Sequence, residues 1–388
     1  LVLAGAMILP ALATADIKMG VILGFTGPIE SLTPDMGGSA EVAFKEASDS
    51  GLLLGGQKIV SVRADSTCID NAAATAAAER LVTAEKVAGI MGADCSGVTT
   101  AVANNVAVPN GVPMISPSAT SPALTTIADN GYFFRTAPSD ARQGQVLAAI
   151  TVERGINNVA VTYVNSDYGK GLSDSFAKAF QAMGGKITIS VPHEGGKADY
   201  SAEVASMDSA GGDAMAVFGY VVGGGPKIMQ ASLDSGSFDK FILADGMYGD
   251  DLLTNVDGDL SGTFGTVPGT DSKGAATYAD MANTAGLKGS GPFTGESYDA
   301  AALLILAMQS AGSTDGAAIA SNVMGVANAP GEKIMPGELA KGLRILANGG
   351  AVDYVGATNV ELTGVGEASG SYREFEIRNK AFQTVRFR

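Results

Sequence analysis

The feature that most constrains the fold is an alternation of strand-like and helix-like segments that runs through the chain twice. Its first run has apolar strand candidates at residues 17–23, 58–64, 87–91 and 112–115, with helix candidates at 39–48, 71–83 and 99–106. The second run has strand candidates at 158–164, 186–191, 214–218 and 241–244, with helix candidates at 171–183, 200–209 and 227–235. This alternation is typical of a parallel sheet covered by helices on both faces, so the sequence predicts an α/β protein with two doubly wound, Rossmann-like lobes.

The rest of the chain must pack against these two lobes. Further helices are predicted at 275–285, 294–311 and 337–346, and a terminal hairpin at 371–377 and 381–387. The economical arrangement places 16–137 with 267–350 in lobe 1 and 138–266 with 351–388 in lobe 2. The chain then crosses between the lobes three times and leaves a cleft between them.

The first 15 residues differ from the remainder of the chain. They carry no charge and end in the small-x-small pattern Ala13-Thr14-Ala15, directly before Asp16. This is typical of the end of a secretory signal, and we expect export with cleavage after Ala15. A membrane anchor is the alternative, but about 12 apolar residues fall short of the roughly 20 that span a bilayer. The two cysteines, Cys68 and Cys95, are expected to form a disulfide in an exported protein, with buried free thiols as the alternative.

Charge and motifs exclude several classes of function. The net charge of −15 opposes binding to nucleic acid or anionic lipid, and no cluster of Lys and Arg offsets it. No motif for a phosphate-bearing cofactor and no metal-ligand spacing is found, so we expect neither a cofactor nor a metal. The single histidine, His193, lies in a polar stretch without a nucleophile nearby in sequence. We expect it at the solvated surface, and we expect no catalysis.

Two polar clusters follow strand candidates of the first half. One contains Ser96 and the other contains Ser118, Ala119 and Thr120. In doubly wound sheets, ligands bind beyond the carboxyl ends of the strands, next to helix N-termini. Hydroxyl and backbone N–H groups at that edge can hold a small carboxylate. The alternative is ordinary helix capping, for which Ser and Thr are favoured residues.

The corresponding strand ends of the second half carry two aromatic residues and one acid. Tyr168, Tyr220 and Asp245 each follow a strand candidate. The tyrosines would cover a ligand and donate hydrogen bonds, and Asp245 would balance an ammonium group. Each residue alone has an ordinary structural explanation, namely packing for the tyrosines and a turn for Asp245-Gly246. Their joint placement favours a site.

Several stretches resemble one known family. They are GVILGFTGP at 20–28, Cys68 with Cys95-Ser96, MISPSATSPALT at 114–125, FRT at 134–136, DYGKG at 167–171 and SYDA at 297–300. Together they resemble the periplasmic receptors of the leucine/isoleucine/valine-binding type, which serve ABC importers. The resemblance implies the type I periplasmic binding fold, with two lobes joined by three crossing strands that close on a ligand by a hinge motion.

The resemblance also assigns roles to residues. It implies that Ser96 and Thr120 bind the ligand α-carboxylate, that Ser118 and Ala119 add backbone groups, and that Tyr168 and Tyr220 come from the second lobe. It implies a Cys68–Cys95 disulfide. Asp245 stands where leucine-binding members have a glutamate and would pair with the α-ammonium group. Leu32, where several relatives have an aromatic residue, is a further pocket candidate together with Cys95 and Tyr298.

The resulting hypothesis is a periplasmic receptor that captures an aliphatic or branched-chain amino acid. We expect a monomer that does not insert into the membrane and delivers its ligand to the permease of an ABC importer. One alternative is the same fold binding an aromatic or other carboxylate, or an amide, without an α-amine. Another is a sensor module that reports the ligand to a membrane receptor.

Overall fold

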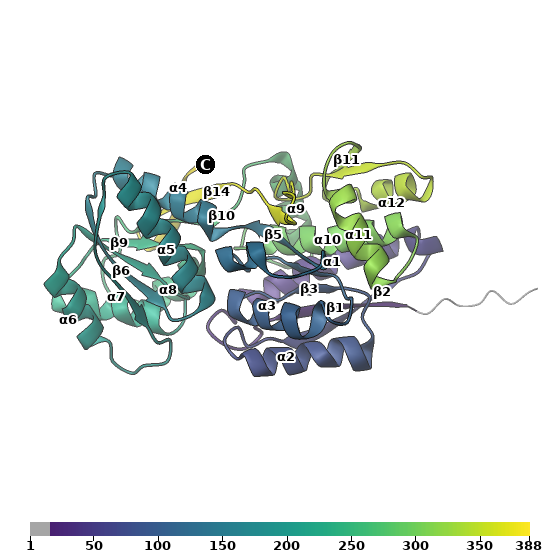
Figure 1. The fold of residues 1–388 in the computed structure, drawn as a ribbon. Coiled ribbons are helices and arrows are strands. Elements are labelled where there is room, and N and C mark those ends of the chain that lie inside the picture. Colours follow the sequence, from purple (N-terminus) through teal and green to yellow (C-terminus); the bar gives the residue numbers. More distant parts are fainter. Residues whose placement is uncertain (1–15) are drawn as a thin grey trace, which may run out of the picture.

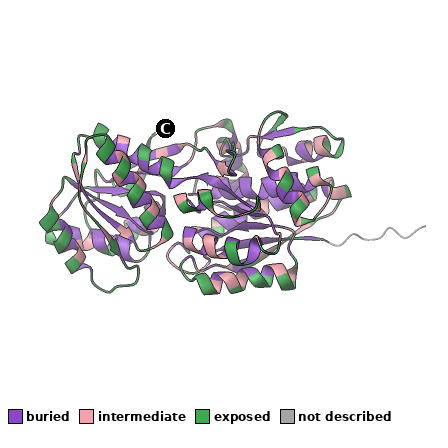
Figure 2. Cartoon of the chain, viewed as in Figure 1, coloured by how far each residue is buried: buried purple, intermediate pink, exposed green. Residues whose placement is uncertain are grey.

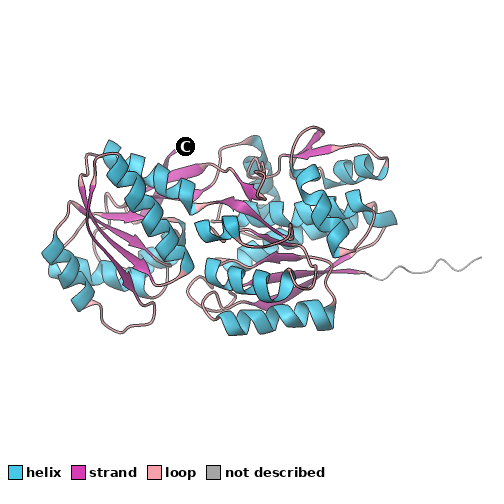
Figure 3. Ribbon diagram, viewed as in Figure 1, coloured by secondary structure: helices cyan, strands magenta, loops and turns pink. Residues whose placement is uncertain are grey.

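The protein has two lobes, each built on a β-sheet, in a computed structural model that describes residues 16–388 (Figure 1). The expected signal segment, residues 1–15, lies outside the described residues. Helices lie on both sides of each sheet (Figure 3), and most strands run parallel to their neighbours. The predicted fold class is therefore confirmed.

The first sheet has six parallel strands in the order β13-β5-β4-β3-β1-β2. These strands are β1 (Ile17–Leu23), β2 (Ile59–Asp65), β3 (Ile90–Gly92), β4 (Met114–Ser116), β5 (Phe133–Pro138) and β13 (Glu367–Ala368). The α-helices of this lobe are α1 (Thr33–Asp49), α2 (Asn71–Glu79), α3 (Ser96–Val102), α9 (Lys273–Thr284), α10 (Thr294–Ala311), α11 (Gly316–Ala327) and α12 (Leu339–Ala347). Short 3-10 or π segments are η1 (Leu53–Gly55), η2 (Arg80–Glu85), η3 (Ala103–Ala107) and η4 (Pro122–Thr126), and a small sheet pairs β11 (Glu332–Ile334) with β12 (Val352–Tyr354).

The second sheet has seven strands in the order β15-β14-β10-β9-β8-β6-β7. Its strands are β6 (Asn158–Val164), β7 (Lys186–His193), β8 (Ala214–Phe218), β9 (Phe241–Leu243), β10 (Phe264–Pro268), β14 (Tyr372–Arg378) and β15 (Ala381–Phe387). Its helices are α4 (Asp140–Glu153), α5 (Asp167–Ala182), α6 (Ser201–Ala210), α7 (Gly224–Ser235), η5 (Asp245–Met247) and α8 (Asp250–Asn255). The terminal hairpin β14–β15 is antiparallel, and β14 pairs with β10.

Burial follows the layers of the two lobes, with the sheets inside and the exposed residues on the outer helices (Figure 2). The exception is α10, which is buried along nearly its whole length. Its sequence is apolar on all sides between Ala300 and Met308, and such a helix is stable only inside a protein. It packs against α1, α11 and α12 and forms the centre of the first lobe.

The chain passes between the lobes at three places. The first passage joins β5 to α4 near Pro138, and the second follows β10 at Pro268. The third lies between β13 and β14, at residues 369–371. Residues 352–368 pair with strands of the first lobe, so the expected start of the second-lobe segment at 351 is wrong. The strands β12 and β13 have only three and two residues, which is too short for a recognisable pattern.

Other differences concern residues near helix starts. The helix expected from 171 begins at Asp167, because the Ser166 hydroxyl accepts a hydrogen bond from Gly169 N–H. His193 ends β7 rather than lying in a solvated loop, and only 2% of it is exposed. Its Nδ1 lies 2.9 Å from Thr162 Oγ1, and burial lowers the pKa of the imidazole to about 4. The expectation of a surface histidine is therefore wrong, because the strand continues two residues further than the pattern predicted.

Candidate ligand-binding site

The carboxyl edge of the first sheet is held together by Asp94. This buried carboxylate accepts hydrogen bonds from Gly24 N–H at 2.5 Å, Ser66 Oγ at 2.8 Å and Cys95 N–H at 2.9 Å. Burial raises the pKa of Asp94, and these three donors oppose that rise. The Cys68–Cys95 disulfide joins the same loops, with 5.1 Å between the Cα atoms, as expected from the resemblance. The loops after β1, β2 and β3 are thereby fixed relative to one another.

Ser96 and Ser118 lie at this edge. Ser96 is the first residue of α3, and its Oγ accepts a hydrogen bond from Ser121 N–H at 3.1 Å. Ser118 Oγ donates to the carbonyl oxygen of Asp94 at 3.1 Å. Both side chains line the cavity between the lobes. A serine at a helix N-terminus offers a hydroxyl beside backbone N–H groups, which suits a carboxylate.

Ala119 and Thr120 lie behind this edge and not on the cavity wall. Ala119 N–H donates to Ser116 Oγ, and its carbonyl oxygen accepts from Arg135. The Thr120 carbonyl oxygen accepts from Asp140 N–H at 2.8 Å. Thr120 Oγ1 is buried without a partner in hydrogen-bonding geometry among the described residues. The Thr120 hydroxyl lies beside the buried Asp140 and lowers the pKa of that carboxyl group, so Thr120 faces Asp140 rather than the cavity.

The second lobe contributes Tyr168, Tyr220 and Asp245. The two tyrosine rings stack, with their centroids 5.4 Å apart. Tyr168 Oη donates to Asp245 Oδ1 at 3.3 Å and accepts from Gly246 N–H at 3.1 Å. A Cβ atom at Gly246 would lie 2.4 Å from the carbonyl oxygen of Gly219, so only glycine fits there. Burial raises the pKa of both tyrosines and of Asp245.

The two sets of residues face one another across a single cavity. Its walls combine residues from both lobes: Ile29, Leu32, Met36, Asp94, Cys95, Ser96, Ser118, Tyr168, Tyr220, Asp245, Gly246 and Phe293. The cavity volume is about 30 Å³, enough for one or two waters. A ligand the size of an amino acid therefore needs the lobes to separate or the lining side chains to move.

Tyr298, a further pocket candidate, lies elsewhere. It is buried in α10, where its Oη donates to Glu46 Oε2 at 2.5 Å and accepts from Gly337 N–H at 3.3 Å. Its ring packs against Tyr278, 5.3 Å between centroids. The SYDA motif therefore contributes to the core of the first lobe and not to the cavity wall.

Five residues of the cavity wall are not among the predicted site residues: Ile29, Met36, Asp94, Gly246 and Phe293. Ile29 and Met36 are single apolar residues of the β1–α1 connection and of α1, and nothing distinguishes them from core residues. Phe293 has a left-handed backbone, with φ of 59°, which is unusual for a bulky residue and cannot be predicted from composition. Asp94 follows the strand candidate at 87–91, two residues before Ser96. That position at a strand end is the signal by which the sequence could indicate it.

A second carboxyl group lies close to Asp245. Asp140, in the first turn of α4, is fully buried, and neither of its carboxyl oxygens has a partner in hydrogen-bonding geometry among residues 16–388. Burial and the negative charge of Asp245 together raise the pKa of Asp140 well above its usual value. Gln143, one helical turn further on, lowers the pKa of Asp245. In sequence, Ser139-Asp140 is indistinguishable from an ordinary helix start.

Comparison with known proteins assigns this chain to a family. The model of the family described as periplasmic binding protein matches residues 16–339. The chain belongs to this family. Among relatives of this periplasmic binding protein, the "Leu/Ile/Val-binding protein homolog 1" of Brucella abortus is 30% identical, covering 78% of this chain and 81% of the relative. The "chemotactic signal transduction system substrate-binding protein BasB" of Halobacterium salinarum is 26% identical, covering 96% and 89%.

Solved structures share the fold of this periplasmic binding protein. The leucine-binding protein LivK of Thermotoga maritima superposes with a TM-score of 0.77 at 23% identity, covering 96% of this chain and 98% of the other. A solute-binding protein of an R. palustris ABC transporter, in complex with 4-hydroxybenzoate, reaches a TM-score of 0.75 at 19% identity, covering 96% and 97%. The predicted family is confirmed, and its members here are solute-binding proteins and not enzymes.

Within residues 16–388, no group of three or more His, Cys, Asp or Glu side chains is arranged to hold a metal ion. None of the helices in the same stretch combines the length and the apolar character needed to cross a bilayer.

Proposed function

We propose that this protein is an extracytoplasmic receptor that captures an amino acid with an aliphatic or branched side chain and delivers it to an ABC importer. The observation that carries the proposal is the pairing of hydroxyl groups on one lobe with a buried acid on the other. Ser96 and Ser118 face Asp245 across one cavity. The ligand that such a cavity complements has an anionic and a cationic end.

The cavity supports one orientation of the ligand. The α-carboxylate would lie at the N-terminus of α3, where Ser96 offers its hydroxyl group. The α-ammonium group would lie toward Asp245, the charged acid of the pair, because burial and the charge of Asp245 favour the protonated, neutral form of Asp140 behind it. Ile29, Leu32, Met36 and Phe293 would then contact the side chain. Their apolar surface favours an aliphatic side chain over a polar one.

Closure of the two lobes would complete the site. Ser121 Oγ of the first lobe donates to the Asp167 carbonyl oxygen of the second at 3.1 Å, and Lys288 forms an ion pair with Asp250 at 3.1 Å. These contacts join the lobes beside the cavity, which is too small for an amino acid as it stands. Hinge rotation about the three passages would open the cavity and then enclose the ligand.

Isothermal titration with leucine tests this function. Asp245→Asn should weaken leucine binding about 30-fold or more, because it removes the charge partner of a desolvated ammonium group. Asp208→Asn, an exposed acid on α6, is the matched control and should bind as the parent does. Unchanged leucine affinity in Asp245→Asn, or no binding of any amino acid to the parent, would refute the assignment.

A carboxylate without an amine is the second candidate. The stacked Tyr168 and Tyr220 rings favour it, because an aromatic ring would extend the stack. The same titration with 4-hydroxybenzoate separates the two candidates. Such a ligand should bind Asp245→Asn at least as well as the parent, because its carboxylate gains nothing from the acid.

Location, partner and assembly complete the proposal. We propose export with cleavage after Ala15, a monomeric receptor, and a membrane permease as its partner. Mass spectrometry of the exported protein tests the cleavage position. Uptake that requires this chain in reconstituted vesicles would support transport, whereas ligand-dependent binding to a membrane receptor without uptake would favour a sensor.

A further inference from the structure

A second cavity lies at the hinge, apart from the ligand cavity between the lobes. Its volume is about 130 Å³. It is bounded by the second passage of the chain at Pro268–Thr270, by α9 and the start of α10 in the first lobe, and by Arg373 and Phe387 of the terminal hairpin in the second. Pockets that hold drug-sized ligands measure roughly 300 Å³ or more, so only a molecule of a few atoms fits here.

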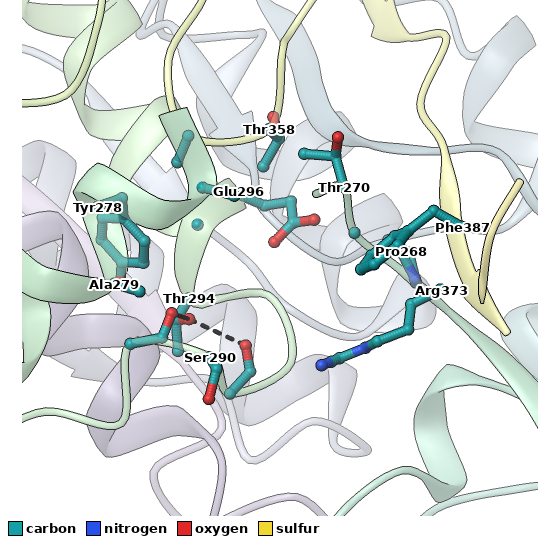
Figure 4. Close-up of a pocket in the computed structure, with 16 residues that line it drawn as sticks. Pro268, Thr270, Tyr278, Ala279, Ser290, Thr294, Glu296, Thr358, Arg373 and Phe387 are labelled. Carbon is teal, nitrogen blue, oxygen red and sulfur yellow. Dashed lines mark hydrogen bonds between the residues drawn. The ribbon is translucent and has the colours of Figure 1, made fainter. Parts of the chain in front are cut away.

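Glu296 provides the negative side of this hinge cavity. It lies in the first turn of α10, is 5% exposed, and points into the space (Figure 4). Among residues 16–388, no side chain forms a hydrogen bond or ion pair with its carboxyl group, although its backbone carbonyl accepts from Thr136 Oγ1. Burial raises the pKa of Glu296 to about 7, with Asp299 adding to the rise and Arg373 opposing it. The backbone N–H of Glu296 itself also opposes the rise, but no side chain donates to this buried acid.

Arg373 provides the positive side. It lies on β14, and its guanidinium group stands over the Tyr248 ring, 4.8 Å from the centroid. Its Nε is buried without a hydrogen-bond partner among the described residues. Figure 4 shows Glu296 and Arg373 entering the cavity from different sides. Within residues 16–388 they form no ion pair with one another, and neither has another ion-pair partner, although Arg373 acts on Glu296 from a distance.

We propose that the hinge cavity is a second binding site, for a small zwitterion whose ammonium group meets Glu296 and whose carboxylate meets Arg373. Side-chain hydroxyl groups of Thr270, Ser290 and Thr358 line the same walls and can accept or donate the remaining hydrogen bonds. A neutral solute would leave the buried Glu296 and the half-buried Arg373 without partners, and a simple ion would satisfy one of them. The opposite charges of Glu296 and Arg373 therefore favour a ligand that carries both a positive and a negative group.

Occupancy of the hinge cavity would act on the angle between the lobes. Its walls belong to both lobes and to the second passage, and Glu296 also borders the crevice lined by Thr136, Pro138 and Gly370 at the other two passages. A ligand that bridges Glu296 and Arg373 would favour the lobe arrangement in which both are within reach. It would then change the affinity of the main cavity for its own ligand. The ligand of the main cavity would change the affinity of the hinge cavity by the same factor.

Glycine, the smallest zwitterionic amino acid, is the probe. The full chain would carry Ser96→Ala and Asp245→Asn to disable the main cavity, and its melting temperature would be followed against glycine concentration. We expect a saturable rise, at least tenfold weaker in apparent affinity when either Glu296→Gln or Arg373→Gln is added. Acetate and methylammonium, each carrying one charge, should give no saturable rise. Glu361→Gln, an exposed acid, is the control and should keep the glycine response.

Three outcomes would overturn the proposal. They are no saturable glycine effect in the chain with the disabled main cavity, an effect that survives both Glu296→Gln and Arg373→Gln, and equal responses to acetate and glycine. None of them bears on leucine binding by the parent, so failure here is distinct from failure of the proposed receptor function. Leucine titration of Glu296→Gln in the otherwise unchanged chain confirms that this variant folds.

Discussion

Replacing Glu296 with glutamine should stabilise the protein, and the gain should grow with pH. The acid is 5% exposed in the first turn of α10, and burial raises its pKa from 4.5 to about 7. The folded protein therefore binds this proton more tightly than the unfolded chain does. As the pH rises above 4.5 the unfolded chain releases the proton first, so stability falls until the pH passes 7 and then levels off.

The size of the effect follows from these pKa values. Each tenfold difference in proton affinity corresponds to about 1.4 kcal/mol. Relative to a pH at which Glu296 is protonated in both states, its ionisation therefore lowers the free energy of unfolding by about 1 kcal/mol at pH 5 and about 3 kcal/mol at pH 8. Glutamine has nearly the shape of the protonated acid and cannot ionise. The free energy of unfolding of Glu296→Gln minus that of the parent should therefore increase by about 2.5 kcal/mol between pH 5 and pH 8.

Urea denaturation of both proteins at the two pH values measures this difference. The comparison isolates Glu296, because the other titrating groups are common to both chains. Glu361→Gln, at an exposed position before the third passage, should show a difference near zero at both pH values. A difference between Glu296→Gln and the parent that stays constant from pH 5 to pH 8 would refute the reasoning that this carboxyl group is buried without a side-chain partner.

Two further substitutions test the architecture around the main cavity. Asp94→Ala removes the acceptor of three buried donors, so it should lower the free energy of unfolding, measured in urea, by about 3 kcal/mol or more. Asp94→Asn should lower it by less. A loss below about 1 kcal/mol in Asp94→Ala would contradict the role of Asp94 in holding these loops together. Tyr298→Phe should lower the free energy of unfolding by about 1 kcal/mol through the lost bond to Glu46 and leave leucine affinity unchanged, and a tenfold loss of affinity would return Tyr298 to the ligand site.

The sequence predicted best those elements whose patterns are long. The limits of β1, β6, β8, α10 and β15 agree with the predicted ones, because each of these segments has a sustained apolar pattern or clear turn residues at its ends. The sequence pattern does not predict the strands β5 and β10. β5 contains Arg135 and Thr136, and its Arg135 side chain is buried because the Ala119 and Ser121 carbonyl groups and Glu367 satisfy it. No local pattern reveals such distant partners.

The candidate site divides in the same way. Ser96, Ser118, Tyr168, Tyr220 and Asp245 each follow a strand, and the topology of parallel sheets brings such positions together, so sequence reasoning could reach them. Asp140 follows the first passage between the lobes, and Phe293 has an unusual backbone conformation. The positions of both side chains depend on how the two lobes meet. Which acids lie beside Asp245 is decided by tertiary packing, and a single sequence contains no direct record of it.

The three passages of the chain have a consequence for the order in which this protein can be made. The first sheet requires β13, at Glu367–Ala368, and the centre of its lobe requires α10, so a growing chain that has completed β1 to β5 still lacks a large part of that lobe. The second sheet requires β14 and β15, which are the last strands to be synthesised. Neither lobe can finish folding until nearly the whole polypeptide exists. A nascent chain that stays incomplete for so long remains open to passage through a secretion channel before its tertiary structure closes.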